Sequence, residues 1–158
     1  MRARDAFAAL VLLAAGSGKD EAAIRLAAAE AGVEDTFRLL GWRDDVADLY
    51  CAADIFVFAS HREGLPIAPI EAMASGLPVV SYATGSIPEL VGDDGGAVVP
   101  YGANYWKLEP PDTEALADAA LKVLDKSEDY RKSARIRAEE NFSLEKMTAR
   151  YKKVLTED

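Results

Sequence analysis

The sequence contains one cysteine, Cys51, and one histidine, His61. A single cysteine excludes a disulfide within the chain, and this agrees with a reducing, cytoplasmic location. The apolar residues around Cys51 predict a small buried thiol. No acids at ligand spacing surround His61, so the sequence gives no basis for a metal centre, and we interpret His61 as a loop imidazole at the end of a strand.

Basic runs and long apolar runs are also missing. The 27 acidic residues exceed the 18 basic ones, which gives a formal net charge of -9. Such a surface repels polyphosphates and anionic lipid headgroups, so no nucleic-acid partner is expected. No stretch reaches the roughly 20 apolar residues that a membrane span needs. A helical pattern follows the apolar run near the N-terminus, and this favours a buried strand over a secretory signal.

Short apolar runs alternate with helical patterns along most of the sequence. Strands are predicted at 8–14, 37–40, 55–59, 78–81 and 97–99, and helices at 20–31, 45–52, 67–75 and 88–90. Apolar runs without polar alternation, separated by helices, are typical of a parallel sheet covered on both faces. Three more helical patterns fill the last third. We therefore predict one Rossmann-like, doubly wound α/β domain over residues 1–158, closed by C-terminal helices.

Two carboxylates stand out in the segment EGLPIAPIEAMASGLPVVS. Glu63 and Glu71 are separated by seven residues, nearly all apolar, where a predicted strand leads through a loop into a helix. In open parallel sheets, ligands bind at such crossings. A carboxylate accepts hydrogen bonds from both hydroxyls of a vicinal diol, so two of them suit a nucleotide sugar. The alternative is a solvated loop acid and an acid that compensates a helix dipole.

The turn between the two acids also suits a polar ligand. The first-turn amides of the following helix lack partners and carry partial positive charge. Pro66 and Pro69 fit this turn because it needs few amide donors. Gly64 lets a ligand approach the backbone closely. Elsewhere, AAGSGKDEA matches neither a Walker loop nor a dinucleotide fingerprint, and Gly16 and Gly18 are interpreted as a strand-to-helix turn.

The stretch from DIFVFAS through EGLPIAPIEAMASGLPVVSYATGSIPELV to GGAVVP resembles the C-terminal domain of the family 4 retaining glycosyltransferases, which have two Rossmann-like domains. The resemblance implies that Glu63 is the catalytic acid that faces the donor sugar near the reacting carbon. It implies that Glu71 accepts hydrogen bonds from the ribose hydroxyls, and that the base lies near the end of the FRLLGW strand. The donor-binding residues implied in this way are Glu71, Gly64, Leu65, Pro66, Ile67 and Arg43.

The function implied by the resemblance is the donor-binding half of a retaining hexosyltransferase. The donor would be a UDP- or GDP-activated hexose, with no cofactor and no metal, and Glu63 would stabilise and position rather than act as a nucleophile. Two alternatives stay open: a nucleotide-sugar epimerase of similar fold, and a non-catalytic nucleotide-sugar-binding or interaction module. Because the acceptor domain of the family has no counterpart in the sequence, the isolated chain is expected to be inactive. Its expected partners are the donor and either that N-terminal domain or a second chain, and peripheral membrane association is expected only through the absent half.

Two departures from the family pattern affect these predictions. The first strand of the family's domain, which leads to the Arg and Lys that neutralise the donor diphosphate, has no counterpart here. That strand is central in the order 3-2-1-4-5-6, so strands 8–14 and 55–59 are predicted to lack their shared neighbour. In TGSIPEL, Ser86 replaces a second glycine near the sugar. The remaining candidates for neutralising the diphosphate are Arg62, Lys19 and Arg43.

Overall fold

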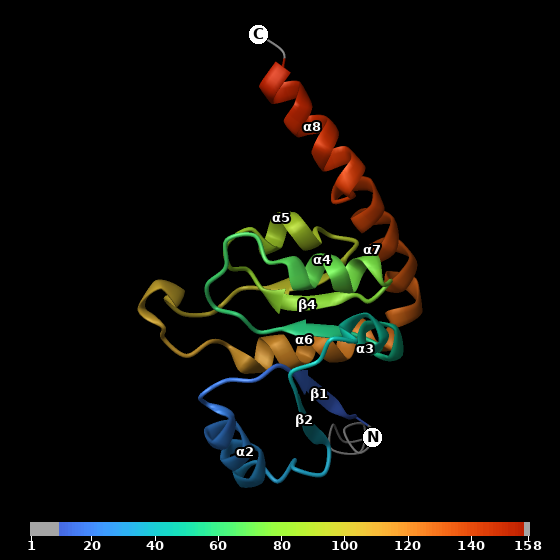
Figure 1. Cartoon of the computed structure of the whole chain (residues 1–158). Helices are drawn as coiled ribbons and strands as arrows, with labels where there is room; N and C mark the ends of the chain where they lie inside the picture. Colours follow the sequence, from blue (N-terminus) through green and yellow to red (C-terminus); the bar gives the residue numbers. More distant parts are fainter. Residues whose placement is uncertain (1–9, 157–158) are drawn as a thin grey trace. The chain divides into compact units, whose positions relative to one another are not determined.

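The computed structural model describes residues 10–156 (Figure 1). The chain forms two compact units, Met1–Val46 and Ala47–Asp158. Each unit has its own parallel sheet, with the strand orders β1-β2 and β3-β4-β5.

The first unit contains a β-α-β element. β1 (Leu12–Ala15) and β2 (Phe37–Gly41) pair in parallel, and α2 (Glu21–Glu30) connects them. Gly16, with a φ of 138°, opens the turn from β1 towards α2, as the sequence predicts. Among the described residues of this unit only Ala28 is buried, so these residues form little core of their own.

The second unit is built on the three-stranded parallel sheet. Its strands are β3 (Phe56–Phe58), β4 (Val79–Tyr82) and β5 (Gly96–Val99). β4 is the central strand, and all four of its residues are buried. Its apolar run lacks polar alternation, as a strand covered on both faces requires.

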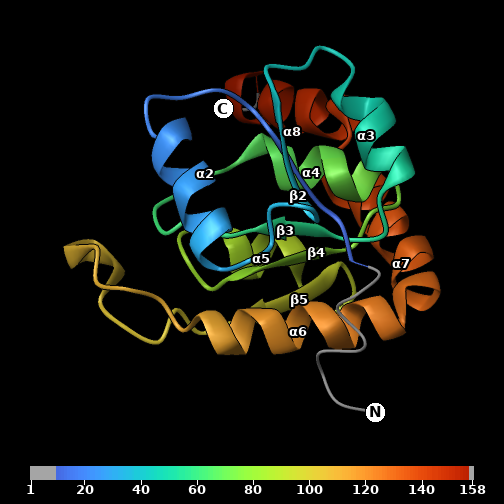
Figure 2. The same ribbon diagram turned by 90° about the horizontal axis from the view of Figure 1, so that it is seen from below.

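Helices cover both faces of this sheet (Figure 1, Figure 2). α4 (Ile67–Ala74) and α5 (Ile87–Val91) lie on one face, and α6 (Thr113–Asp125) lies on the other. This arrangement confirms the predicted doubly wound α/β architecture. The buried core between the sheet and α6 consists of Val80, Tyr82, Tyr101, Leu116, Ala119 and Val123.

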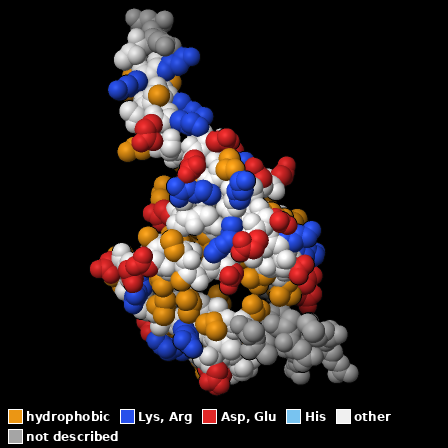
Figure 3. Space-filling model, turned by 90° about the vertical axis from the view of Figure 1, so that its right-hand side faces the viewer, with side chains coloured by type: hydrophobic (Ala, Val, Ile, Leu, Met, Phe, Trp, Pro, Cys, Tyr) orange, Lys and Arg blue, Asp and Glu red, His pale blue; other side chains and the backbone are white. Residues whose placement is uncertain are grey.

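Three more helices belong to this part of the chain. α3 (Val46–Ala52) precedes β3, and α7 (Ser127–Asn141) packs against α4. α8 (Leu144–Thr156) extends away from the sheet, and none of its residues is buried. Figure 3 shows hydrophobic and basic side chains exposed along this helix.

Cys51 lies on α3 and is exposed, so the prediction of a buried thiol is wrong. Tyr50 is the buried residue of this short helix. The next residue along a helix is rotated by about 100° around its axis, which takes Cys51 off the buried side.

The other predicted helices and strands are confirmed, with small shifts at their ends. The part of the predicted strand 8–14 that precedes residue 10 lies outside the described residues, and β1 begins at Leu12. Among residues 10–156, β1 pairs only with β2 and β3 pairs only with β4, so within this range each strand has the unpaired edge that the sequence predicts. The loop 100–112 and its 3-10 helix η1 (Tyr105–Lys107) were not predicted. None of the helices within residues 10–156 combines the length and the hydrophobicity that a membrane span requires.

Candidate functional site

Loops follow the carboxyl ends of the three strands of the second unit. These loops span 59–66, 83–86 and 100–112. Because the strands are parallel, the loops meet at one edge of the sheet, which is where open α/β sheets bind ligands. Every predicted site residue except Arg43 lies in the first of these loops or in α4.

Glu63 lies in the loop after β3 and is half-buried. Its Oε1 accepts a hydrogen bond from the Ser60 hydroxyl at 2.7 Å, and its Oε2 accepts none from any other described residue. The backbone of Ser60 is held in turn by Thr84, whose Oγ1 donates to Ser60 O at 3.1 Å. The carboxylate is therefore oriented by the protein while one of its oxygens remains available to a hydroxyl group.

The loop after β4 fixes the backbone around Glu63. Ser86 donates to Gly64 O twice, from its hydroxyl at 2.5 Å and from its amide at 3.3 Å. Gly85 has a φ of 54°, and a Cβ added to it would overlap the carbonyl oxygen of Glu63. Position 85 therefore requires glycine for both its backbone conformation and this close approach.

The turn at 64–67 contains backbone amides that have no hydrogen-bond acceptor among the described residues. The amides of Gly64 and Leu65 donate to no other described residue. α4 begins at Ile67, so its first amides have no acceptor within the helix, and Pro66 and Pro69 have no amide hydrogen at all. A Cβ added to Gly64 would have nothing within 4 Å. Free donors beside open space suit a phosphate oxygen or a sugar hydroxyl.

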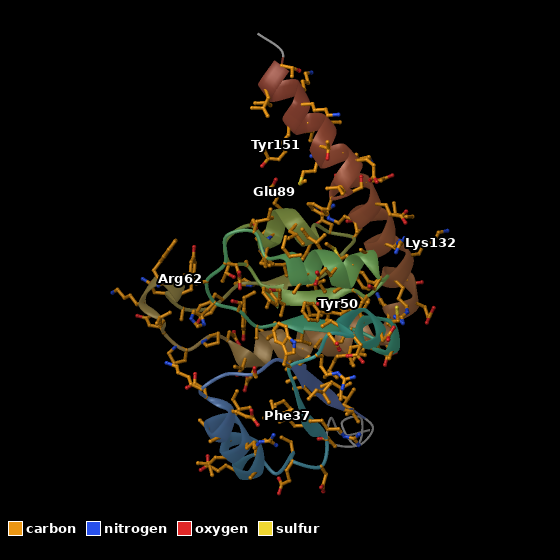
Figure 4. All side chains as sticks on the ribbon, in the orientation of Figure 1. Phe37, Tyr50, Arg62, Glu89, Lys132 and Tyr151 are labelled. Atoms are coloured by element: carbon orange, nitrogen blue, oxygen red, sulfur yellow. The ribbon has the colours of Figure 1, made fainter. Side chains whose placement is uncertain are left out.

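Glu71 lies on the exposed side of the second turn of α4. The effect of the helix dipole is confined to the first turn, so a dipole-compensating role does not fit this position. The pKa of Tyr50 of α3, labelled in Figure 4, is raised first by burial and then by the negative charge and hydrogen bond of Glu71. The Glu71 carboxylate has further acceptor positions for a ligand.

Arg43 belongs to the first unit, where it follows β2. Its Nε donates to Asp45 Oδ1 at 2.7 Å, and its Nη2 pairs with Asp45 Oδ2. The hydrogen bond between the two side chains is the main reason that the pKa of Arg43 is raised and the pKa of Asp45 is lowered. The charge of Arg43 is thus shared with a neighbouring acid, and its contact with a nucleotide stays a prediction.

Arg62 is directed towards the loop 100–112. Its Nη2 donates to Trp106 O at 3.0 Å, and its guanidinium carbon lies 5.7 Å from the centre of the Trp106 ring. Figure 4 shows Arg62 beside the loop that carries η1. Among residues 10–156, no group of three or more His, Cys, Asp or Glu side chains is placed to hold a metal ion.

Some residues of the site were not predicted from the sequence. Ser60 orients Glu63, Tyr50 lies within electrostatic reach of Glu71, and Gly85 makes room for the Glu63 backbone. The small residues of TGSIPEL, directly after a strand, are the sequence signal that could have identified Gly85. The coupling of Glu71 to Tyr50 has no local signal because the two residues lie on different helices.

The family model for the group 1 glycosyl transferases matches residues 1–126. The chain belongs to this family. Its curated relatives include N-acetyl-alpha-D-glucosaminyl L-malate synthase of Bacillus anthracis, which is 30% identical over 146 residues, or 90% of this chain and 36% of the relative. Lipopolysaccharide core biosynthesis mannosyltransferase LpsB of Rhizobium meliloti is 32% identical over 66% of this chain and 28% of the relative. The chain thus spans about a third of the length of these glycosyl transferases.

Solved structures of glycosyl transferases share the fold. Sucrose-phosphate synthase from Thermosynechococcus elongatus matches with a TM-score of 0.73 and 25% identity, over 94% of this chain and 39% of that chain. Anabaena HepE in complex with UDP-glucose matches with a TM-score of 0.77 and 22% identity, over 96% of this chain and 43% of that chain. The Rossmann-like fold and the predicted resemblance to glycosyltransferases are therefore confirmed.

Proposed function

We propose that the chain is the donor-binding part of a glycosyltransferase that transfers a hexose from a nucleoside-diphosphate sugar to an acceptor hydroxyl. Transfer retains the anomeric configuration and uses no metal ion. The observation that carries the proposal is the half-buried Glu63 carboxylate, which Ser60 orients beside a turn of unpaired backbone amides. The complex of HepE with UDP-glucose supports a nucleotide sugar, carrying UDP or GDP, as the donor.

The two acids have different roles in this proposal. Glu63 accepts hydrogen bonds from the hexose hydroxyls and stabilises positive charge near the reacting carbon. Glu71 accepts hydrogen bonds from the ribose, and the amides of the turn 64–67 bind diphosphate oxygens. Glycosidases also use paired carboxylates, but one of them must protonate the leaving group. A nucleoside diphosphate leaves without that proton, so neither acid has to be protonated here.

Calorimetric titration with UDP and UDP-glucose tests whether Glu63 and Glu71 have these different roles. Glu71→Ala is expected to weaken the binding of both ligands by about 1.5–3 kcal/mol, because it removes a charged acceptor from the ribose. Glu63→Ala is expected to spare UDP and to weaken the binding of UDP-glucose alone. Glu89→Ala, which removes an exposed acid from α5, is the matched control for net charge.

Equal losses for UDP and UDP-glucose in both variants would contradict the assigned roles. A thermal-shift screen of UDP, GDP and their hexose derivatives identifies the donor, because stabilisation grows with ligand excess over the dissociation constant. Stabilisation by none of them would favour an interaction module. Turnover of a nucleotide sugar without any acceptor would favour an epimerase.

A further inference from the structure

The loop 100–112 between β5 and α6 is long and internally bonded. Connections longer than about 12 residues are uncommon in compact domains and are usually functional. Its ends are joined by a hydrogen bond from Asp112 N to Tyr101 O at 2.8 Å. Inside it, Asn104 Oδ1 accepts from Trp106 N at 3.1 Å, and the Tyr101 hydroxyl donates to Glu109 O at 2.8 Å. These contacts make it a compact Ω-loop with a defined shape.

A row of aromatic rings connects this loop to the core. The ring centres lie 5.2 Å apart for Tyr82 and Tyr101, 6.0 Å for Tyr101 and Tyr105, and 5.0 Å for Tyr105 and Trp106. Tyr82 is buried, whereas Trp106 is 67% exposed. The row therefore holds a large apolar ring at the surface in a fixed orientation, which lowers the entropy lost when a ligand binds to it.

The exposed indole is tied to the proposed donor loop. Arg62, which donates to Trp106 O and lies over its ring, directly precedes Glu63 in the chain. Trp106 thus lies within the reach of one arginine side chain from the loop that carries Glu63. Leu108, close by in the loop, is 59% exposed and has a φ of 58°, the only positive φ of a non-glycine residue in the described part of the chain. Strained backbone of this kind concentrates at ligand sites.

We propose that Trp106, Leu108 and Arg62 form a saccharide subsite for the acceptor of the transfer reaction. A pyranose ring stacks its apolar C–H face on the indole, and guanidinium N–H groups that Trp106 O leaves unused donate to sugar hydroxyls. The subsite rests on the proposed function, because continuity with the Glu63 loop is what identifies the ligand as an acceptor.

The size of the surface favours a saccharide over a protein partner. A stable protein interface involves roughly 20–30 residues and about 800 Å² on each side. Trp106 and Leu108 are two exposed apolar side chains, two positions apart on one loop, which is far fewer than such an interface uses.

Tryptophan fluorescence tests the subsite without any need for catalysis. The sequence has two tryptophans, so Trp42→Phe leaves Trp106 as the reporter. Titration of this variant with maltotriose and with an α-linked mannotriose is expected to give a saturable change in emission for at least one of them. In the otherwise unchanged chain, Trp106→Ala is expected to weaken calorimetric binding of that saccharide about tenfold, with Trp106→Phe in between.

Tyr151→Ala is the matched control, because Tyr151 is an aromatic residue of similar exposure on α8, labelled in Figure 4. This variant should bind the saccharide as the unchanged chain does. No saturable change with either saccharide, or equal affinity in Trp106→Ala, overturns the subsite. UDP binding by the unsubstituted chain is measured in parallel. If this chain binds UDP but no saccharide, only the subsite is overturned. If it does not bind UDP, the proposed function is overturned.

Discussion

Gly64 and Gly85 belong to the same site but have opposite surroundings. A Cβ at Gly85 would overlap the backbone of Glu63, and its φ of 54° is unfavourable for any other residue. Gly64 has no such constraint, since nothing lies within 4 Å of its Cβ position. One glycine is therefore required by the fold, and the other is available to the ligand.

Alanine substitution should separate these two roles. Gly85→Ala is expected to lower the free energy of unfolding by about 1–3 kcal/mol, because both the backbone strain and the overlap must be relieved. Gly64→Ala should change it by less than about 0.5 kcal/mol and yet weaken UDP-glucose binding. Urea unfolding measures the free energy of unfolding, and calorimetric titration measures the affinity for UDP-glucose. Unchanged donor affinity in Gly64→Ala would show that the space over this residue is not used.

The sequence predicts the site residues to the extent that they are local. Glu63 and Glu71 are recognisable because a loop acid and a helix acid flank a proline-containing turn within one short segment. Some contacts around them come from outside this segment: Tyr50, whose pKa Glu71 raises, lies in the preceding helix, and Ser86, which donates to Gly64 O, lies in the loop after the next strand. Such contacts depend on how elements pack, which no spacing in the sequence records.

Helix α7 supplies arginines to the C-terminal ends of three other helices. Arg131 donates to the backbone at the end of α3, Arg135 to the last residue of α4, and Arg137 to the last turn of α5. The last carbonyls of a helix have no partners within it and carry partial negative charge. α7 therefore stabilises the helix ends on the side of the unit opposite to the proposed ligand loops.

Arg137 should be the most sensitive of these arginines. It donates to Glu89 O at 2.6 Å and to Leu90 O at 2.8 Å, and its side chain is only 21% exposed. Arg137→Met, which keeps the apolar stem, is expected to lower the free energy of unfolding by about 1.5–3 kcal/mol. Lys132→Met on the exposed side of α7, labelled in Figure 4, should change it by less than about 0.5 kcal/mol. Equal effects in urea unfolding would mean that the helix ends gain nothing from Arg137.

Elements with a clear hydrophobic period were predicted well. Gly76 ends α4 at the expected place, with a φ of 74° and its amide bonded to Met73 O. The loop 100–112 was missed because its shape comes from the side-chain cap of Asn104 and from stacked aromatic rings, which have no period.

The two units differ in how much they bury. The described residues of the first unit pair two strands and bury only Ala28, whereas every residue of β4 in the second unit is buried. Two-stranded sheets are marginal without further packing. Hydrogen exchange should therefore show amides of β1 and β2 exchanging much faster than those of β4. Similar protection in both sheets would mean that the first unit is stabilised by more than its described contacts.

The unpaired edges of β1 and β3 were predictable. The resemblance to the family predicts that strands 8–14 and 55–59 lack a shared neighbour, and in the described part of the chain β1 pairs only with β2 and β3 only with β4. The sequence did not predict that the chain forms two compact units, because this depends on which helices and strands pack together.

The edges of β1 and β3 that pair with no other described strand have a practical consequence. Each presents a row of peptide groups that any extended polypeptide can join, so at high concentration the isolated chain is prone to associate through these rows into larger particles. A short peptide of strand-forming sequence, added in trans, would compete for the same positions and keep the chain dispersed.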